Sequence, residues 1–199
     1  ADQVASAKAM LGKAVGFATV EGRGQVPGFA AYLAGEFRTV GFADTDIVIE
    51  PFGETAALIV TYRGQGQAAP ILLNAHMDVV EAKREDWTRD PFVLTEEGGY
   101  LFGRGVGDNK FDLTMIVQTL IRLKREGFNP RGDLVLVLTG DEETKQATTA
   151  ALAPRFKGAA MVLNCDSGGG TLSTDGKPLY YSLQTAEKTY ADFKLTVTN

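Results

Sequence analysis

The hydrophobic positions in the first third of the chain follow two different periods. Apolar residues spaced three and four positions apart predict amphipathic helices over residues 4–17 and 27–42. Short apolar runs then predict β-strands over residues 46–52, 56–64 and 71–78. The chain is therefore expected to begin with two helices that are followed by three strands.

Charged and glycine positions interrupt this pattern in the middle of the chain. Residues 81–91 are rich in charge and predict a loop, and residues 92–103 predict a hairpin that turns at Gly98–Gly99. The clearest helix is predicted over 112–127, where apolar residues recur every three or four positions. Basic residues gather in its last turn, which suits the negative end of the helix dipole, and a glycine ends it.

The last part of the chain alternates strands and helices. Residues 133–140 and 161–166 predict fully buried strands, with a helix over about 144–157 between them. Apolar strands that alternate with amphipathic helices imply an α/β sandwich with a mostly parallel sheet flanked by helices. Residues 188–199 begin a new alternating pattern. We therefore expect one domain over 1–187 and the first strand of a second domain over 188–199.

Composition and charge exclude several classes of protein. The net charge of −5 argues against a general binder of nucleic acid or anionic membranes, because such proteins need a basic surface. No apolar stretch reaches the length of a membrane span, and the single cysteine, Cys165, rules out an internal disulfide framework. Residues 1–20 lack the features of a signal peptide, but the chain does not begin with Met. A periplasmic or secreted location and a cytoplasmic one both remain open.

Acidic residues and the one histidine of the sequence fall at the ends of predicted strands or just before a helix. They are His76 with Asp78, Asp141 with Glu142 and Glu143, Asp166, and Asp108 before the helix at 112. In open α/β sheets, ligands bind in the crevice at the carboxyl ends of the strands. If the strands are parallel neighbours, these side chains are expected to converge on one place.

Converging carboxylates repel one another, and a divalent metal ion would supply the opposing charge. Imidazole together with carboxylates suits Zn²⁺, with Co²⁺ or Mn²⁺ as alternatives. Asp78 is placed to accept the second ring N–H of His76 and so to fix its tautomer. The adjacent pair Glu142 and Glu143 allows one carboxylate to bind metal while the other acts as a general base.

Each of these residues also has a plain structural explanation. A lone histidine such as His76 is usually a satisfied core residue. An acidic triplet after a strand is more often a solvated helix start, and Asp108 suits the N-cap of its helix. Taken singly these explanations are favoured, whereas the shared position of these residues at strand ends, with Asp108 just before a helix, favours a joint site.

Four motifs occur in a fixed order along the chain. They are His76-Met77-Asp78-Val79-Val80, Trp87 with Asp90-Pro91-Phe92, Gly103-Arg104-Gly105-Val106-Gly107-Asp108-Asn109-Lys110, and Gly140-Asp141-Glu142-Glu143. Together they resemble the signature of the co-catalytic dizinc aminoacylase/carboxypeptidase family of metallopeptidases across residues 70–166. That family includes glutamate carboxypeptidase, peptidase T and succinyl-diaminopimelate desuccinylase. The resemblance implies that residues 1–187 form its catalytic domain.

The resemblance also implies a metal-ligand set. Asp108 would bridge two zinc ions, and His76, Glu143 and Asp166 would each bind one or the other. In the family the peptide bond after the bridging aspartate is often cis, which would be the Asp108–Asn109 bond here.

The implied reaction is hydrolysis of an amide bond in a peptide or an N-acyl amino acid. Glu142 would be the general base for a metal-activated water, and Asp78 would orient His76. Residues 188–199 would begin the lid or dimerisation domain through which family members form homodimers.

Several positions depart from the family pattern. Family members have a second metal-binding histidine near their C-terminus, and this sequence holds one histidine in all. We therefore expect a fragment that is inactive alone, with a non-catalytic α/β module that binds metal or ligand as the alternative. Glu81, Phe111 and residues 144–146 also differ from the usual residues, which puts substrate preference in doubt but not the metal ligands.

Overall fold

The computed structural model describes residues 2–166, 169–186, 191 and 193–198. These residues form two compact units that divide after Asp166. The first unit holds every residue of the predicted site.

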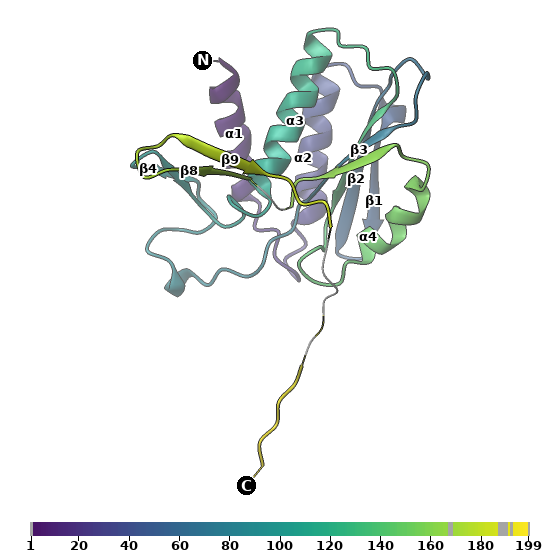
Figure 1. Ribbon diagram of the computed structural model, residues 1–199. Helices are drawn as coiled ribbons and strands as arrows, with labels where there is room; N and C mark the ends of the chain where they lie inside the picture. Colours follow the sequence, from purple (N-terminus) through teal and green to yellow (C-terminus); the bar gives the residue numbers. More distant parts are fainter. Residues whose placement is uncertain (1, 167–168, 187–190, 192, 199) are drawn as a thin grey trace. The chain divides into compact units, whose positions relative to one another are not determined.

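A five-stranded sheet forms the centre of the first unit, with its strands in the order β1-β2-β6-β3-β7 (Figure 1). The strands are β1 (Ile47–Phe52), β2 (Thr55–Tyr62), β3 (Ile71–His76), β6 (Leu134–Thr139) and β7 (Met161–Asn164). Strand β3 pairs in parallel with both β6 and β7, whereas β2 is antiparallel to both β1 and β6. Because β2 alone runs in the opposite direction, the mostly parallel sheet expected from the sequence is confirmed.

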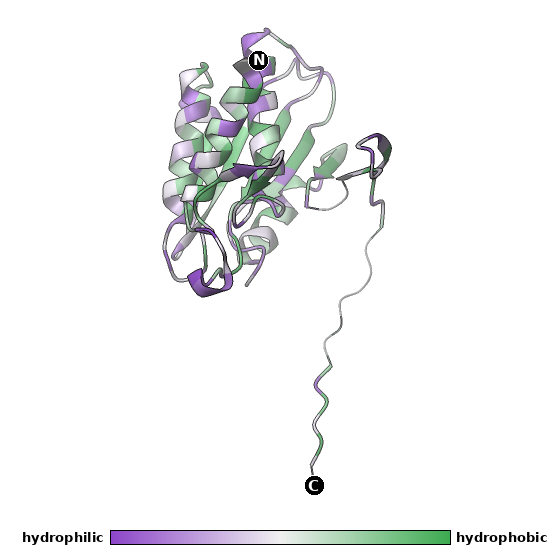
Figure 2. Ribbon diagram, turned by 90° about the vertical axis from the view of Figure 1, so that its left-hand side faces the viewer, coloured by the Kyte–Doolittle hydropathy of each residue, from purple (hydrophilic) through white to green (hydrophobic). Residues whose placement is uncertain are grey.

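Helices lie on both faces of this sheet, so that the unit has three layers (Figure 1). One face is covered by α1 (Asp2–Gly16), α2 (Val26–Thr39) and α3 (Lys110–Arg125). The other carries the short α4 (Ala147–Leu152) and the 3₁₀ helix η3 (Ala153–Phe156). Figure 2 shows that the strands between these layers are mainly hydrophobic.

The two faces bury unequal amounts of apolar side chain. Under α1, α2 and α3 lies the larger cluster, in which Phe29, Leu33 and Phe37 are fully buried because they recur every four residues on one side of α2. Under α4 lies a smaller cluster, formed by Ala57, Leu72, Val135, Val137 and Leu152. Most of the apolar burial that stabilises this unit is therefore on the three-helix face.

The predicted hairpin is present as β4 (Thr95–Glu97) and β5 (Tyr100–Phe102). Its turn residues Gly98 and Gly99 have φ of 59° and 83°. Two successive positive φ angles are those of a tight hairpin turn that glycine adopts without steric cost. Two short 3₁₀ helices, η1 (Asp44–Asp46) and η2 (Arg84–Asp86), lie in the connecting loops.

The predicted helix over 144–157 is shorter and divided in the structure. It begins at Ala147 and becomes the 3₁₀ helix η3 after Leu152. Pro154 has no N–H to donate to a carbonyl four residues earlier, which favours the change of helix type.

The prediction that strand 161–166 is fully buried is wrong. Met161, Val162 and Leu163 are 45, 56 and 39% exposed. Among the described residues, their strand, β7, lies at the edge of the sheet and pairs with β3 alone. The run of apolar residues without polar alternation therefore indicated a central strand, whereas the order of strands places this one at an edge.

The second unit contains a hairpin of β8 (Gly169–Leu172) and β9 (Pro178–Ser182). A turn joins these two strands, in which the Ser173 N–H donates to the Lys177 carbonyl at 2.9 Å. Residues 188–190, 192 and 199 of the predicted strand 188–199 lie outside the described residues, and 193–198 carry no strand. The second domain that they were expected to begin remains a prediction.

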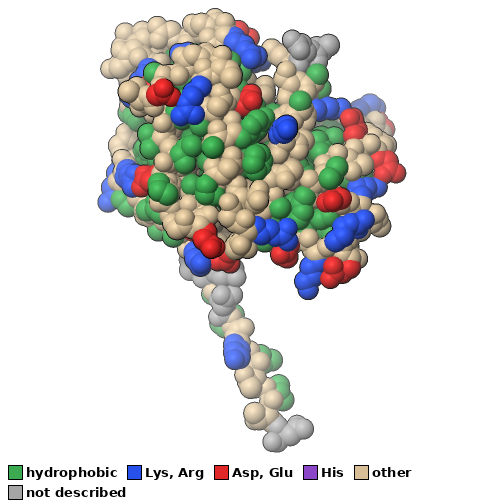
Figure 3. Space-filling model, turned by 180° about the vertical axis from the view of Figure 1, so that it is seen from behind, with side chains coloured by type: hydrophobic (Ala, Val, Ile, Leu, Met, Phe, Trp, Pro, Cys, Tyr) green, Lys and Arg blue, Asp and Glu red, His purple; other side chains and the backbone are tan. Residues whose placement is uncertain are grey.

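Charged side chains of both signs are interspersed on the face shown in Figure 3, with hydrophobic side chains between them. Surface ion pairs of the described residues include Arg38–Asp44 and Arg155–Glu50. Among the described residues, no helix combines the length and the apolar character needed to cross a bilayer.

Candidate metal centre

Five of the predicted site residues meet at the carboxyl ends of the parallel strands. Within the described chain, two sets of side chains each bring their ligand atoms within 4.8 Å of one another. One set is His76, Glu142 and Asp166, and the other is His76, Asp108 and Glu143. The imidazole belongs to both sets, so the predicted convergence is found and His76 is at its centre.

His76 ends β3 and is 1% exposed. Its Nε2 lies 2.8 Å from Asp108 Oδ1 and 3.3 Å from Asp166 Oδ1. On the other side of the ring, Nδ1 lies 3.1 Å from the main-chain carbonyl of Asp78 and 3.4 Å from its carboxylate. The ring is thus fixed by Asp78 on one side and aimed at two carboxylates on the other.

The protonation of His76 shows what charge this place favours. Burial lowers the pKa of the imidazole, but the carboxylates of Asp78, Asp108 and Asp166 outweigh burial and raise that pKa to about 10. The surroundings therefore hold a positive charge among the carboxylates. A divalent cation bound to neutral imidazole and carboxylates would meet the same electrostatic demand, so these residues fit a metal ion.

The neighbouring carboxylates have pKa values that are shifted upwards. Burial and then the charge of Asp166 raise the pKa of Glu142, and burial and then Asp108 raise that of Glu143. Burial also raises the pKa of Asp166. His76 lowers that pKa, and Asp108 raises it further. These carboxylates lie close together and are partly shielded from water. Such clusters of groups with shifted pKa values are characteristic of functional sites.

Asp78 joins the end of β3 to the loop that follows β6. Its two carboxylate oxygens accept hydrogen bonds from the main-chain N–H groups of Glu142 and Glu143, each at 3.0 Å. The side chain is almost wholly buried. Asp78 therefore positions the backbone of both glutamates as well as contacting the His76 ring.

The acidic triplet Asp141–Glu143 divides between two roles. The Asp141 carboxylate is buried and accepts hydrogen bonds from the N–H groups of Ala147 at 2.8 Å and Thr148 at 3.0 Å. It also accepts from the Thr148 hydroxyl. Asp141 thus serves a helix start by satisfying the first N–H groups of α4, although it is buried and not solvated as that explanation expected. Glu142 and Glu143 each belong to one of the two metal-ligand sets.

Asp108 does not cap the helix that follows it. Its side chain is 64% exposed and contacts the His76 ring, and the residue before α3 is Asn109, which makes no side-chain cap bond. The Asp108–Asn109 peptide bond is cis, as the family resemblance implied.

Two residues of the first turn of α3 belong to the surroundings of the site, although the sequence pattern gave them no role. Lys110 is fully buried, and its Nζ donates to the carbonyls of Ala14 at 2.9 Å and Phe17 at 2.7 Å. Burial lowers its pKa to about 7. Burial followed by the charges of Asp108 and Asp166 raises the pKa of Asp112. Lys110 is the last residue of the Asp108 motif and Asp112 lies two positions after it, which was the one available signal.

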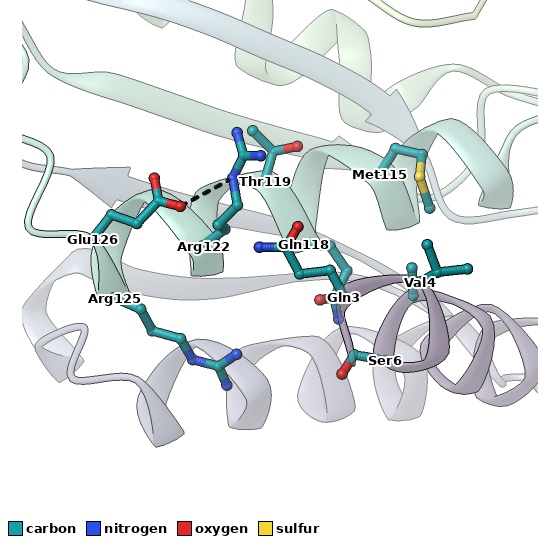
Figure 4. Close-up of a pocket in the computed structure, with 10 residues that line it drawn as sticks. Gln3, Val4, Ser6, Met115, Gln118, Thr119, Arg122, Arg125 and Glu126 are labelled. Carbon is teal, nitrogen blue, oxygen red and sulfur yellow. Dashed lines mark ion pairs between the residues drawn. The ribbon is translucent and has the colours of Figure 1, made fainter. Parts of the chain in front are cut away.

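One surface depression lies away from the site. A cavity of about 370 Å³ lies between α1 and α3, where Figure 4 shows Gln3, Val4 and Ser6 opposite Met115 and Gln118. None of the predicted site residues lines it. A smaller cavity of about 300 Å³ is lined in part by Asp78 and Asp141 and therefore borders the site.

Known proteins resemble the part of the chain that carries these residues. A probable succinyl-diaminopimelate desuccinylase of Staphylococcus aureus is 46% identical over 92 residues, which are 45% of this chain and 23% of that protein. A probable di- and tripeptidase of Saccharomyces cerevisiae is 29% identical over 136 residues, which are 64% of this chain and 15% of that protein. The matched part thus spans about a quarter or less of the length of these relatives.

Solved structures share the fold. The dipeptidase Dug1p of Saccharomyces cerevisiae has a TM-score of 0.74 at 22% identity, covering 86% of this chain and 40% of that one. Human carnosine dipeptidase 1 has a TM-score of 0.69 at 20% identity, covering 84% of this chain and 40% of that one.

The model of one family matches residues 72–190, which is more than half of the chain. That stretch begins in β3 and contains each of the proposed metal ligands. The chain belongs to peptidase family M20/M25/M40.

Proposed function

We propose that this chain carries the metal centre of a hydrolase that cleaves peptide or amide bonds. The observation that supports this function is the convergence of His76 with Asp108, Glu142, Glu143 and Asp166 within a metallopeptidase fold. These residues come from four separate segments of the sequence, which a purely structural role for each would not require.

The proposed ligands are His76, Asp108, Glu143 and Asp166, and the proposed metal is Zn²⁺. A mixture of imidazole nitrogen and carboxylate oxygen suits zinc, although Co²⁺ and Mn²⁺ accept similar ligands. Two ions with Asp108 between them are proposed from the family resemblance. The exposure of the Asp108 carboxylate, at 64%, leaves it accessible to a second ion.

A bound divalent ion supplies Lewis acidity toward the substrate carbonyl and lowers the pKa of a water molecule. Glu142 is proposed to take the proton of the attacking water and to pass it to the leaving amine. Its raised pKa, caused first by burial and then by Asp166, suits a group that must both accept and donate a proton. Asp78 holds the main chain of Glu142 in place for this transfer.

The substrate class is proposed from the relatives. One relative is a probable desuccinylase and another is a probable di- and tripeptidase. The simplest substrate feature common to both activities is an amide bond next to an amino acid that bears a carboxylate. We therefore propose a short peptide or an N-acyl amino acid. Homodimer formation through a lid domain is proposed from the resemblance alone and is tested by the mass of the native protein in solution.

The 199 residues include a single histidine, which favours the proposal that this chain does not turn over substrate by itself. The same observation favours the alternative that it is a non-catalytic metal-binding module.

The deciding experiment compares the wild type with the variants E142A and E143A after loading with zinc. Bound metal is measured by mass spectrometry, and hydrolysis is measured on dipeptides and N-acyl amino acids. We expect E142A to keep its zinc and E143A to lose it, because only Glu143 is a proposed ligand. The reverse pattern would exchange the two roles.

Three possible results, each judged first on the wild type, distinguish the enzyme from the non-catalytic module. Hydrolysis that disappears in E142A would support the enzyme and refute the inactivity of the chain alone. Zinc that is bound through His76 without hydrolysis would favour the non-catalytic module or a need for further residues. Failure to bind zinc would refute the metal centre.

A further inference from the structure

The parallel pairing of β3 and β7 ends in an unusual way beside the site. The register pairs Asn74 with Asn164, and the Cys165 N–H still donates to the Asn74 carbonyl at 3.0 Å. In a regular parallel ladder the next hydrogen bond would run from the His76 N–H to the Cys165 carbonyl.

The side chain of Asn109 occupies the position of that bond. Its Oδ1 accepts from the His76 N–H at 3.3 Å, and its Nδ2 donates to the Cys165 carbonyl at 2.9 Å. One direct backbone bond is thus replaced by two bonds through a carboxamide. Asn109 is 1% exposed and its hydrogen bond to the His76 N–H is buried, so this N–H depends on the carboxamide as its partner.

The chemistry of the two partners requires an amide at this position. The His76 N–H is a donor and the Cys165 carbonyl is an acceptor, so the inserted group must offer one acceptor and one donor in a planar arrangement. A carboxylate would face the Cys165 carbonyl with a second acceptor, and an apolar side chain would satisfy neither group.

The three segments that Asn109 joins are the ones that carry three proposed metal ligands. His76 ends β3, Asp166 follows Cys165, and Asp108 precedes Asn109 itself. The amide therefore sets how far apart the ends of β3 and β7 lie, and ties both to the loop that carries Asp108.

We propose that Asn109 is a positioning residue whose side-chain amide, inserted between β3 and β7, sets the spacing of His76, Asp108 and Asp166 for a divalent cation. This inference rests on the proposed metal centre. Groups that orient metal ligands without touching the metal typically change metal affinity about 10- to 100-fold when they are removed.

The test uses the variants N109A and N109L, which both remove the amide but differ in the volume they leave. Co²⁺ is the probe, because its visible absorption reports the geometry of its ligands as well as its binding. We expect both variants to bind Co²⁺ about 10- to 100-fold more weakly than the wild type and to show an altered spectrum at saturation.

A matched control is available on the same two strands. The Asn74 side chain donates to Asn164 Oδ1 at 3.2 Å within the regular part of the ladder. The variant N164A removes this link between β3 and β7 without touching the inserted amide. We expect the Co²⁺ affinity of N164A to stay within about twofold of that of the wild type. If N164A loses as much Co²⁺ affinity as N109A, the proposal is overturned.

The outcomes distinguish this proposal from the metal centre on which it rests. If the wild type binds Co²⁺ through His76 but N109A and N109L bind equally well with unchanged spectra, the positioning role is refuted and the metal centre stands. If the variants only unfold at lower temperature with unchanged affinity, the role of Asn109 is structural alone. If the wild type does not bind Co²⁺, both proposals fail.

A measurement on the wild type covers the case in which the variants do not fold. Zinc binding is expected to shift the NMR resonances of the Asn109 side-chain NH₂ and to slow its hydrogen exchange. A resonance that does not respond to a saturating amount of zinc would overturn the positioning role.

Discussion

The helix-covered face of the sheet and the carboxyl end of its strands lie in the same unit but differ in the surroundings that they give to buried side chains. Under α2, Phe29, Leu33 and Phe37 are fully buried against apolar partners. At the strand ends, His76 is just as buried but is surrounded by carboxylates. The first region supplies stability, whereas the second gathers charges that the metal-free fold does not need.

The difference is also visible in how each region treats a buried polar group. In the packed face, the Tyr62 hydroxyl donates to the Phe128 carbonyl at 2.5 Å, so burial is matched by a local partner. At the site, Glu142, Glu143 and Asp166 have pKa values raised by burial and by nearby carboxylates. Conflicts of this kind are expected where a protein retains residues for function.

The largest expected effect comes from breaking the packed face. Phe37 is 0% exposed and packs edge-on against Phe42, with ring centroids 5.0 Å apart. We expect F37A to lower the free energy of unfolding by about 3–5 kcal/mol in urea denaturation, because it leaves a cavity. The exposed Tyr100 is a control, and Y100A is expected to cost less than about 1 kcal/mol. Equal losses in the two variants would contradict the comparison.

Metal addition tests the site without changing the core. At a zinc concentration a hundredfold above its Kd, we expect the free energy of unfolding to rise by about 2.7 kcal/mol, since the ion binds the folded state alone. H76A is expected to lose this increase, and F37A to keep it on its lower baseline. Urea denaturation with zinc and with chelator checks this, and an equal increase in H76A would place the metal elsewhere.

A third change should make the metal-free site more stable. Burial, Asp108 and Glu142 raise the pKa of Glu143, so its charge is unfavourable in the folded protein. We expect E143Q to raise the stability of the chelator-treated protein by about 1 kcal/mol, the scale of one like-charge contact at 4 Å in water. The exposed Glu85 gives a control, E85Q, with no expected change. Lower stability in E143Q would mean that attraction to His76 outweighs the repulsion.

The smallest effect concerns Glu50, a carboxylate whose pKa is lowered and not raised. Arg155 donates two hydrogen bonds of 2.6 Å to Glu50 and thereby lowers the pKa of Glu50 below its ordinary value of 4.5. The pair therefore stabilises the fold above pH 4.5, and this contribution is lost as the pH falls through the lowered pKa. We expect R155M to melt slightly lower than the wild type at neutral pH and equally in strong acid. A difference that persists in strong acid would argue against the ion pair.

Local patterns in the sequence were sufficient for most elements of the first unit. The helices at α1, α2 and α3 and the strands of the sheet lie within a few residues of their predicted ranges, because each repeats a helix or strand period over its own length. Gly98 and Gly99 likewise marked the hairpin turn. The residues at strand ends, and the rule that ligands bind there, placed the candidate site.

What only the tertiary structure decided depends on partners that are distant in sequence. The order of strands put β7 at an edge and exposed Val162, and the hydrogen bonds of Asp141 turned it toward α4 rather than toward the site. Asn109 reaches the His76 backbone 33 positions away, and Asp78 reaches the N–H of Glu143 65 positions away. A periodic pattern records which residues are apolar and in what local conformation, but not which donor meets which acceptor. That pairing is fixed only when the sheet has assembled.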